Sequence, residues 1–456
     1  MNAIGAFLTF VRAKLPHRFV TFFATSIAAR GVGIVCQLLQ VPLVVGALGT
    51  EAFGLWMTMT SITNLIQFAD LGLGIGLQNR LTEKFTHSQF APAREQFGSV
   101  FVFLAVVGLV LGSVLTIIIS HLNLPVLFHL RDSVTIAQAP LAAVALTWTF
   151  CAAFPIGLAQ RLAFARHEGW MCNVAQAVGS LGGLAAVALG VRSGWGLAAL
   201  VLAAQGVLLL ANAVLLAVQL FQLRWFTGLF SALHFSSVRD LLGVGAFFSV
   251  QQVVSTVMFS LPQVIISASL GAAAVTPYNL VQRLFNLFAV IQNAFLLPLW
   301  PAYSQARARG EFDWMRLALR RSFQATALGC IAPLVLCAGF APWIIGLWVG
   351  HDQVAPDYPL VALLCLLNIL SFLQLPCLYL LVAVSEVKVI TLYSVAGAIA
   401  GVTLMLALVR FLGVHGVVLG LLFGYMPFNF FGNLSEARRY LRRHLPVTNP
   451  SLLPVL

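Results

Sequence analysis

Long apolar runs, separated by short polar breaks, follow one another along the whole sequence. A helix needs about 20 apolar residues to cross a bilayer, and runs of that length predict twelve membrane spans. Only 8% of the 456 residues are charged and the mean hydropathy is +0.97, so the apolar surface has to face lipid. The predicted spans are 19–47, 53–76, 98–120, 136–159, 171–191, 195–221, 243–269, 273–300, 322–349, 358–384, 389–411 and 414–434.

The loops between these runs alternate in charge. Twenty Lys and Arg fall on the side that holds both termini, against three on the other side. Cytoplasmic loops carry an excess of Lys and Arg, so the pattern predicts a multi-pass protein with both termini in the cytoplasm. The bases are spread between the apolar runs, which accounts for the net charge of +12 without a nucleic-acid partner.

The chain reads as two halves of six spans, residues 1–222 and residues 223–456, the second with a short cytoplasmic tail. A shift of 222 residues aligns Gly49 with Gly271 and Asn64 with Asn286. An amphipathic stretch follows two long helices in each half, at 81–97 and at 303–320. Parallel repeats of this kind occur in transporters that bind substrate between the repeats. We therefore expect an all-α membrane protein with two parallel six-helix lobes around a central cleft.

Polar residues inside the predicted spans gather on one face of the first two helices of each half. Lipid penalises such groups, so the faces indicate a water-filled cleft, although hydrogen bonds between helices are the alternative. For Gln205, Asn212 and Gln219 in the sixth span, the alternative is preferred. The four faces are Ser26, Arg30, Gly33 and Gln37; Thr60, Asn64 and Gln67; Ser249, Gln252, Thr256 and Ser260; and Asn279, Gln282, Arg283, Asn286 and Asn293.

The charged residues within the predicted spans indicate whether the cleft is positive or negative. Arg30 and Arg283 lie within spans, whereas the first, seventh and eighth spans contain no acidic residue. The planar guanidinium fork suits phosphate, so the cleft is expected to prefer an anion. Asp70 lies near the inner end of the second span and is expected to be structural. It either pairs with Arg30 or stays at the headgroup level, rather than carrying a proton.

Signals for enzyme chemistry are absent from the sequence. There is no Walker A loop, no H-E-x-x-H and no Cys-x-x-Cys, and the seven cysteines fall in or beside apolar runs, where they read as small core residues. The spacing Gly179-x-x-x-Gly183 predicts close helix packing. We expect no catalytic residue, cofactor or metal.

The run from Pro42 to Trp56, PLVVGALGTEAFGLW, is followed by Asp70-Leu71-Gly72-Leu73-Gly74 and by Gln78-Asn79-Arg80. This opening resembles that of the O-antigen and polysaccharide flippases, which belong to the multidrug, oligosaccharidyl-lipid and polysaccharide (MOP) exporter superfamily. Within it, Pro42, Gly49, Gly54 and Asp70 read as structural positions.

The resemblance implies a bacterial inner-membrane flippase, which moves an undecaprenyl-pyrophosphate-linked O-antigen or exopolysaccharide unit across the membrane by alternating access. The pyrophosphate would lie on Arg30 and Arg283. Polar support would come from Gln37, Asn64, Gln252, Asn279, Gln282 and Asn286. The implied partners are the lipid-linked oligosaccharide, membrane lipids, and the polysaccharide polymerase and chain-length machinery.

Three alternatives remain at this stage. A multidrug or cation antiporter of the same superfamily would be expected to carry an acid in the first or seventh span. A major-facilitator transporter also has six plus six helices, but residues 78–97 lack that family's Gly-rich Asp-Arg signature. A membrane scaffold that transports nothing would not need polar faces on four equivalent helices.

Overall fold

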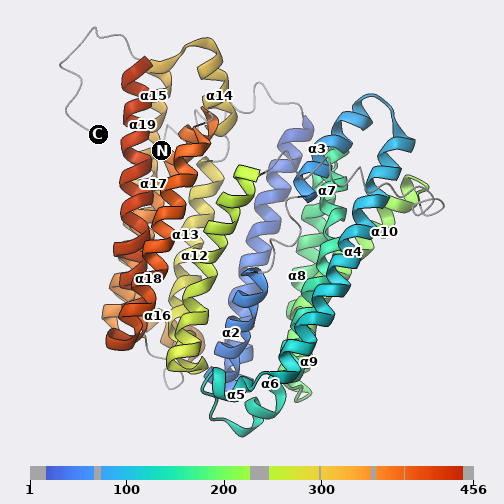
Figure 1. The fold of residues 1–456 in the computed structure, drawn as a ribbon, viewed down its shortest axis with the longest axis vertical. Helices are drawn as coiled ribbons and strands as arrows, with labels where there is room; N and C mark the ends of the chain where they lie inside the picture. The colour runs from blue at the N-terminus through green and yellow to red at the C-terminus, as the bar shows by residue number, and fades with distance from the viewer. Residues whose placement is uncertain are drawn as a thin grey trace. The chain divides into compact units, whose positions relative to one another are not determined.

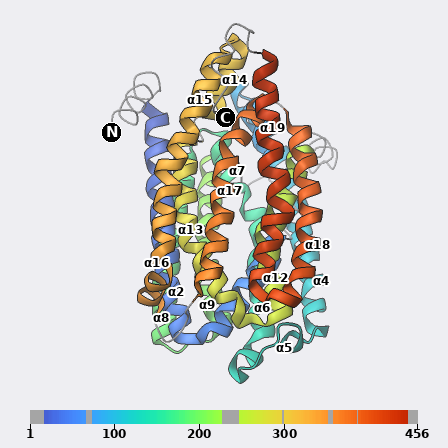
Figure 2. The same cartoon turned by 90° about the vertical axis from the view of Figure 1, so that its left-hand side faces the viewer.

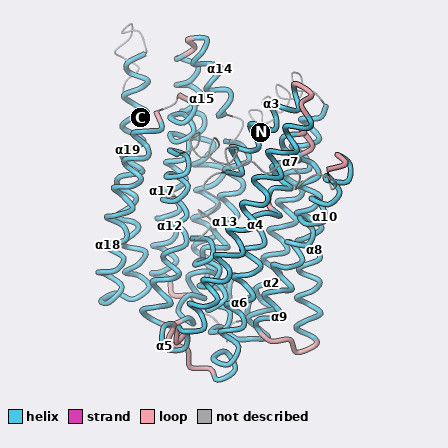
Figure 3. Tube along the Cα trace, turned by 45° about the vertical axis from the view of Figure 1, so that its right-hand side comes forward, coloured by secondary structure: helices cyan, strands magenta, loops and turns pink. Residues whose placement is uncertain are grey.

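The computed structural model of the chain is built of helices. Among the residues that it describes there is no strand (Figure 1, Figure 3). The structure describes residues 17–65, 73–225, 246–296, 299–350, 356–384 and 386–444. The chain forms two compact units, residues 1–249 (unit 1) and residues 250–456 (unit 2). The expected division at 222/223 follows the end of α10 and stays a prediction.

Unit 1 is built around the packing of α2 on α8, α8 on α10, and α4 on α6. The short helix α5 lies at the end of the unit opposite to α3 and α7 (Figure 1). Its elements are α2 (His17–Leu65), α3 (Leu73–Thr86), α4 (Phe90–His121), α5 (Leu124–Leu127), α6 (Ser133–Ile156), α7 (Leu158–Ala165), α8 (Gly169–Arg192), α9 (Leu197–Val201), the π-helix η2 (Leu202–Gly206) and α10 (Val207–Gln222).

Unit 2 is built around α17, which packs on α13, α18 and α19. The amphipathic helices α14 and α15 lie at the end of the unit where α19 ends (Figure 2). The elements are α12 (Ala246–Leu270), the 3₁₀ turn η3 (Ala272–Ala274), α13 (Val275–Leu296), α14 (Leu299–Arg309), α15 (Phe312–Thr326), the π-helix η4 (Ala327–Ile331), α16 (Ala332–Val349), α17 (Tyr358–Ala383), α18 (Val387–Gly420), the π-helix η5 (Leu421–Tyr425) and α19 (Met426–His444).

Nine helices in the described part of the chain are long and apolar enough to cross a membrane. Two of these regions are interrupted by a glycine with non-helical backbone angles, Gly49 in α2 and Gly413 in α18. A further helix, α13, has 22 residues and carries the polar face around Arg283. The all-α multi-pass architecture is confirmed, and the count of twelve spans stays a prediction.

The two aligned glycines share an unusual conformation. Gly49 has φ 81° and ψ 174°, and Gly271 has φ 96° and ψ 158°. Residues that carry a Cβ rarely adopt such positive φ values. No atom lies within 4 Å of the position where a Cβ on Gly49 would stand. Gly49 is therefore required for the shape of the turn rather than for close packing. The same turn occurs 222 residues later, at the spacing that the repeat predicts.

The turn after Gly49 is tied to the start of α6. The Glu51 carboxylate accepts hydrogen bonds from the backbone N–H groups of Arg131 (2.9 Å) and Asp132 (3.0 Å). Asp132 then caps α6, since its Oδ2 accepts from the backbone N (2.8 Å) and the Oγ1 (2.6 Å) of Thr135. These two bonds, the hydroxyl one first, lower the pKa of the Asp132 carboxyl. The Glu-Ala-Phe-Gly motif thus secures a loop of unit 1.

The remaining predicted structural positions lie in the same region. Pro42 stands inside α2. Gly54 is buried, and its carbonyl accepts a hydrogen bond from the hydroxyl of Thr58 at 2.8 Å. Asp70 lies outside the described residues, so its role stays a prediction.

Glycines hold the last two helices of each half close together. A Cβ on Gly183 of α8 would lie 3.1 Å from the carbonyl oxygen of Ala204, as the predicted close packing requires. In unit 2 both helices contribute a glycine, because a Cβ on Gly424 would lie 2.5 Å from the Cα of Gly401. Both contacts involve π-helical segments, η2 and η5. The cysteines pack as predicted, with six buried and Cys337 half-buried.

Candidate substrate site

Unit 2 contains a cavity of about 590 Å³ that many amide side chains line. This volume is within the range of about 300–1,000 Å³ that small-molecule sites occupy. Its walls come from α12, α13, α17, η5 and α19. The lining residues are Ser255, Met258, Phe259, Gln263, Tyr278, Asn279, Gln282, Arg283, Asn286, Ala289, Gln292, Asn293, Leu367, Asn368, Ser371, Phe372, Gln374, Leu375, Leu378, Leu421, Tyr425, Met426, Asn429 and Asn433.

The predicted face of α13 forms one wall. Asn279, Gln282, Arg283 and Asn286 all line the cavity, because positions i, i+3, i+4 and i+7 lie on the same side of a helix. The side chains differ in exposure: Asn279 is 6% exposed, Gln282 and Arg283 are half-buried, and Asn286 is exposed. Asn293, the fifth residue that the sequence placed on this helix face, also lines the cavity, so the structure brings all five together.

A chain of hydrogen bonds orients Arg283. Its Nε donates to Oδ1 of Asn279 at 2.9 Å, and Nδ2 of Asn279 donates to Oε1 of Gln263 at 3.3 Å. Among the described residues that line the cavity, Arg283 is the one with a charged side chain, and none is an Asp or Glu. A cavity with that composition attracts anions and repels cations.

The opposite wall, on α17, was missed by sequence reasoning. Asn368, Ser371 and Gln374 line the cavity from this helix, which packs against α13 (Figure 2). Their spacing of three residues puts them on nearby positions of one helix face. That spacing was the available signal, but each of the three is isolated between apolar residues.

Amides of the lining also bond to neighbouring helices, some of which lie outside the cavity walls. Gln292, which is fully buried, donates from Nε2 to the carbonyl of Phe372 (2.7 Å) and to Oγ1 of Thr326 (3.2 Å). Asn429 accepts at Oδ1 from the hydroxyl of Ser394 at 2.9 Å. These bonds link α13 to α17 and α15, and α19 to α18. Residues of the cavity lining thus help to hold in place the helices that border it.

The predicted polar face of α2, in unit 1, is divided between two surroundings. Asn173 of α8 donates to the hydroxyl of Ser26 at 2.9 Å, and Gly33 faces Ser180 of the same helix. Arg30 and Gln37, on the same face, are exposed. Half of the predicted face thus packs against a neighbouring helix, and the cleft role of Arg30 and Gln37 stays a prediction.

The remaining predicted site residues are not part of the cavity as described. Asn64 is half-buried near the end of α2. Gln67 and Asp70 lie outside the described residues, as does the side chain of Gln252. The pairing of Arg30 with Asp70 therefore stays a prediction.

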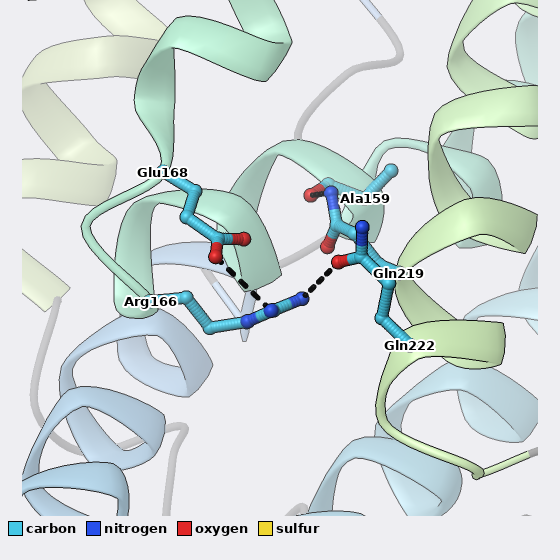
Figure 4. Close-up of polar contacts among 5 residues, drawn as sticks. All are labelled: Ala159, Arg166, Glu168, Gln219 and Gln222. Atoms are coloured by element: carbon cyan, nitrogen blue, oxygen red, sulfur yellow. Dashed lines mark hydrogen bonds and ion pairs between the residues drawn. The ribbon is translucent and has the colours of Figure 1, made fainter.

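Polar residues of unit 1 tie its helices together. Gln160 donates to Oδ1 of Asn212 at 3.0 Å, and Gln219 donates to the carbonyl of Ala159 at 3.1 Å. Asn212 and Gln219, of the predicted sixth span, thus have the interhelical role expected of them. Figure 4 shows the ends of α7, α8 and α10, where Arg166 meets Glu168 at 3.0 Å and Gln222 at 3.1 Å.

Comparisons with known proteins agree on one family and one fold. Residues 23–307, more than half of the chain, match the family described as "Polysaccharide biosynthesis protein". A Yersinia pseudotuberculosis protein named for O-antigen export is 22% identical over 64% of this chain and 66% of its own length. A Salmonella typhi protein named for O-antigen transport is 22% identical over 62% and 63%. The chain thus spans just under two thirds of the length of these relatives.

Solved structures show the same fold at low identity. The inward-facing structure of a multidrug resistance MATE family transporter of the MOP superfamily is 15% identical, with a TM-score of 0.77 over 93% of this chain and 100% of that one. A MOP superfamily transporter from Pyrococcus furiosus is 14% identical, with a TM-score of 0.63 over 94% and 96%. The resemblance found in the opening motif is confirmed: the chain belongs to the polysaccharide biosynthesis protein family and has the fold of the MOP exporter superfamily.

Proposed function

We propose that this protein is a flippase that moves an undecaprenyl-pyrophosphate-linked oligosaccharide, an O-antigen or exopolysaccharide unit, across the bacterial inner membrane. The observation that carries the proposal is the oriented Arg283 in an amide-lined cavity whose described lining holds no acid. The names of the two bacterial relatives, and the description of the solved structures that resemble this chain as transporters, support a transporter rather than an enzyme.

Arg283 suits the pyrophosphate for two reasons. Its guanidinium stays protonated and offers a planar fork of donors to paired phosphate oxygens. The Arg283 side chain is half-buried, so water and salt screen its charge less than they would at an open surface. Arg30, exposed on α2, is proposed to contact the anionic headgroup as well, with Gln37, Asn64 and Gln252 as polar support. Movement across the membrane would proceed by alternating access.

A multidrug or cation antiporter is the competing function, because the solved neighbours with this fold include multidrug transporters. A cationic substrate would have to enter a cavity that already holds a positive charge. Coulomb repulsion at short range in a partly buried site amounts to several kcal/mol. The composition of the cavity therefore favours an anionic headgroup.

The cellular setting of the proposal follows from the charge pattern of the loops. Both termini are proposed to lie in the cytoplasm, with the substrate loaded from the inner leaflet and passed to polysaccharide polymerase and chain-length machinery outside. Asp70 is proposed to fix the inner end of its helix rather than to carry a proton.

The test uses the full chain in liposomes that contain a fluorescent polyprenyl-pyrophosphate oligosaccharide. Transfer between leaflets above the protein-free rate, competed by excess polyprenyl pyrophosphate but not by lipophilic cations, supports the proposal. Transfer of lipophilic cations in place of the lipid-linked sugar supports the antiporter, and transfer of neither supports a scaffold.

A further inference from the structure

Two amide side chains on facing walls of the cavity share one hydrogen bond. Nδ2 of Asn368 donates to Oε1 of Gln282 at 2.9 Å and to the carbonyl of Leu364 at 2.8 Å. A backbone carbonyl only accepts, which identifies the donating atom as nitrogen and so fixes the orientation of both amides. Gln282 and Asn368 are both half-buried and both line the cavity.

This shared bond leaves two groups without a described protein partner. Nδ2 of Asn368 uses both of its hydrogens, whereas Oδ1 of Asn368 and Nε2 of Gln282 take part in no hydrogen bond among the described residues. The pair therefore offers one acceptor and one donor side by side. Each costs free energy if a ligand covers it without matching it.

A donor and an acceptor that lie side by side match only certain chemical groups of a ligand. Adjacent hydroxyls on a sugar ring can donate one bond and accept the other, and so can the N–H and C=O of an acetamido group. A carboxylate offers acceptors alone and an ammonium offers donors alone, so either would leave one member of the pair unmatched.

The position of the pair indicates which sugar it contacts. Gln282 and Arg283 are consecutive residues of α13 and line the same cavity. Phe259, 62% exposed, adds an apolar ring to the lining. We infer that the Gln282–Asn368 pair binds the sugar joined to the pyrophosphate, through its adjacent hydroxyls or its acetamido group. This inference rests on the proposed function, in which Arg283 holds the pyrophosphate.

Unit 1 offers a matched control. Asn212 also donates to the carbonyl four residues earlier (Leu208, 2.9 Å) and bonds to a glutamine amide (Gln160, 3.0 Å). This amide pair joins two helices and is not part of the cavity lining. Removing it imposes a similar structural change without altering the proposed sugar site.

The experiment measures binding to the full chain in nanodiscs of three probes: polyprenyl pyrophosphate, the same lipid carrying one hexose, and the same lipid carrying one N-acetylhexosamine. Asn368→Leu and Gln282→Met remove the polar groups at similar volume. Each should weaken binding of a sugar-bearing lipid by about tenfold and weaken binding of the sugar-free lipid by a much smaller factor. Asn212→Leu should change neither.

Each outcome bears on one of the two proposals. Equal weakening for all three probes, or unchanged binding of both sugar-bearing lipids in variants that fold, overturns the inference and leaves the proposed function intact. Failure of the wild type to bind the sugar-free lipid overturns the proposed function itself. If Asn368→Leu does not fold, Gln282→Met decides. The sugar-bearing lipid that loses affinity identifies the group that is recognised.

Discussion

Amide side chains serve different purposes in the two units. In unit 1 the amides of Gln160, Asn212 and Gln219 bond across helix pairs. In unit 2, ten amide side chains of the described residues line one cavity, where Gln282 and Asn368 keep groups that bond to no other described residue. Similar residue types therefore tie helices together in unit 1 and line a cavity in unit 2. Residue type alone does not distinguish a binding group from a structural one, and the facing helix decides.

The largest expected difference between the units concerns their two intramembrane arginines. Arg283→Ala should weaken binding of polyprenyl pyrophosphate by about ten- to a hundredfold, because a charge-assisted hydrogen bond contributes about 1.5 to 3 kcal/mol. Arg30→Ala should cost less, since Arg30 is exposed and its charge is better screened. Arg283→Lys should restore part of the affinity. Lipid binding and glycan display at matched protein levels measure these effects. Full activity of Arg283→Ala would contradict the anion site.

The next comparison concerns glycines in the π-helical segments. Gly424→Ala should destabilise unit 2 by about 1 to 3 kcal/mol, as overpacking does, because its Cβ would meet the backbone of Gly401 at 2.5 Å. Gly206→Ala in unit 1 should be nearly neutral, since nothing lies within 4 Å of the added Cβ. Thermal unfolding in detergent measures both. Equal losses would mean that the two π segments are equally packed.

The turn at Gly49 provides a smaller test. Glu51→Ala removes two hydrogen bonds to the backbone before α6 and should lower stability by about 1 kcal/mol. Ala273 occupies the equivalent place in unit 2, so only unit 1 has this tie. Glu83→Ala is the control, because its ion pair with Arg80 is exposed and 3.6 Å long. An unchanged melting temperature for Glu51→Ala would show that the loop holds without the carboxylate.

The smallest expected effect depends on pH. The pKa of Asp132 is lowered in the folded protein, so its cap stabilises α6 above the ordinary pKa of about 3.9 and is lost as pH falls through the lower folded value. The difference in melting temperature between the wild type and Asp132→Ala should therefore be present at pH 7 and shrink below about pH 4. A difference that stays constant with pH would assign the effect to helix propensity.

Sequence periodicity predicted the helices and the polar face of α13 because both depend on spacing along one helix. It also identified the face of α2, but not that Ser26 meets Asn173 there, since contacts between distant helices leave no local pattern. Asn368 and Gln374 were missed for the same reason. Each stands alone in an apolar run and becomes part of a site only when α17 packs against α13.

The composition of the cavity also bears on how long a ligand would stay. Within the described lining, the guanidinium of Arg283 provides most of the attraction, while the surrounding neutral amides each contribute only about 0.5 to 1.5 kcal/mol net. Differences in affinity between related complexes lie mostly in the dissociation rate, so a ligand held this way dissociates faster once its contact with Arg283 is weakened. For a transporter, that arrangement favours repeated turnover over tight retention, and it makes release depend on the position of Arg283 on α13.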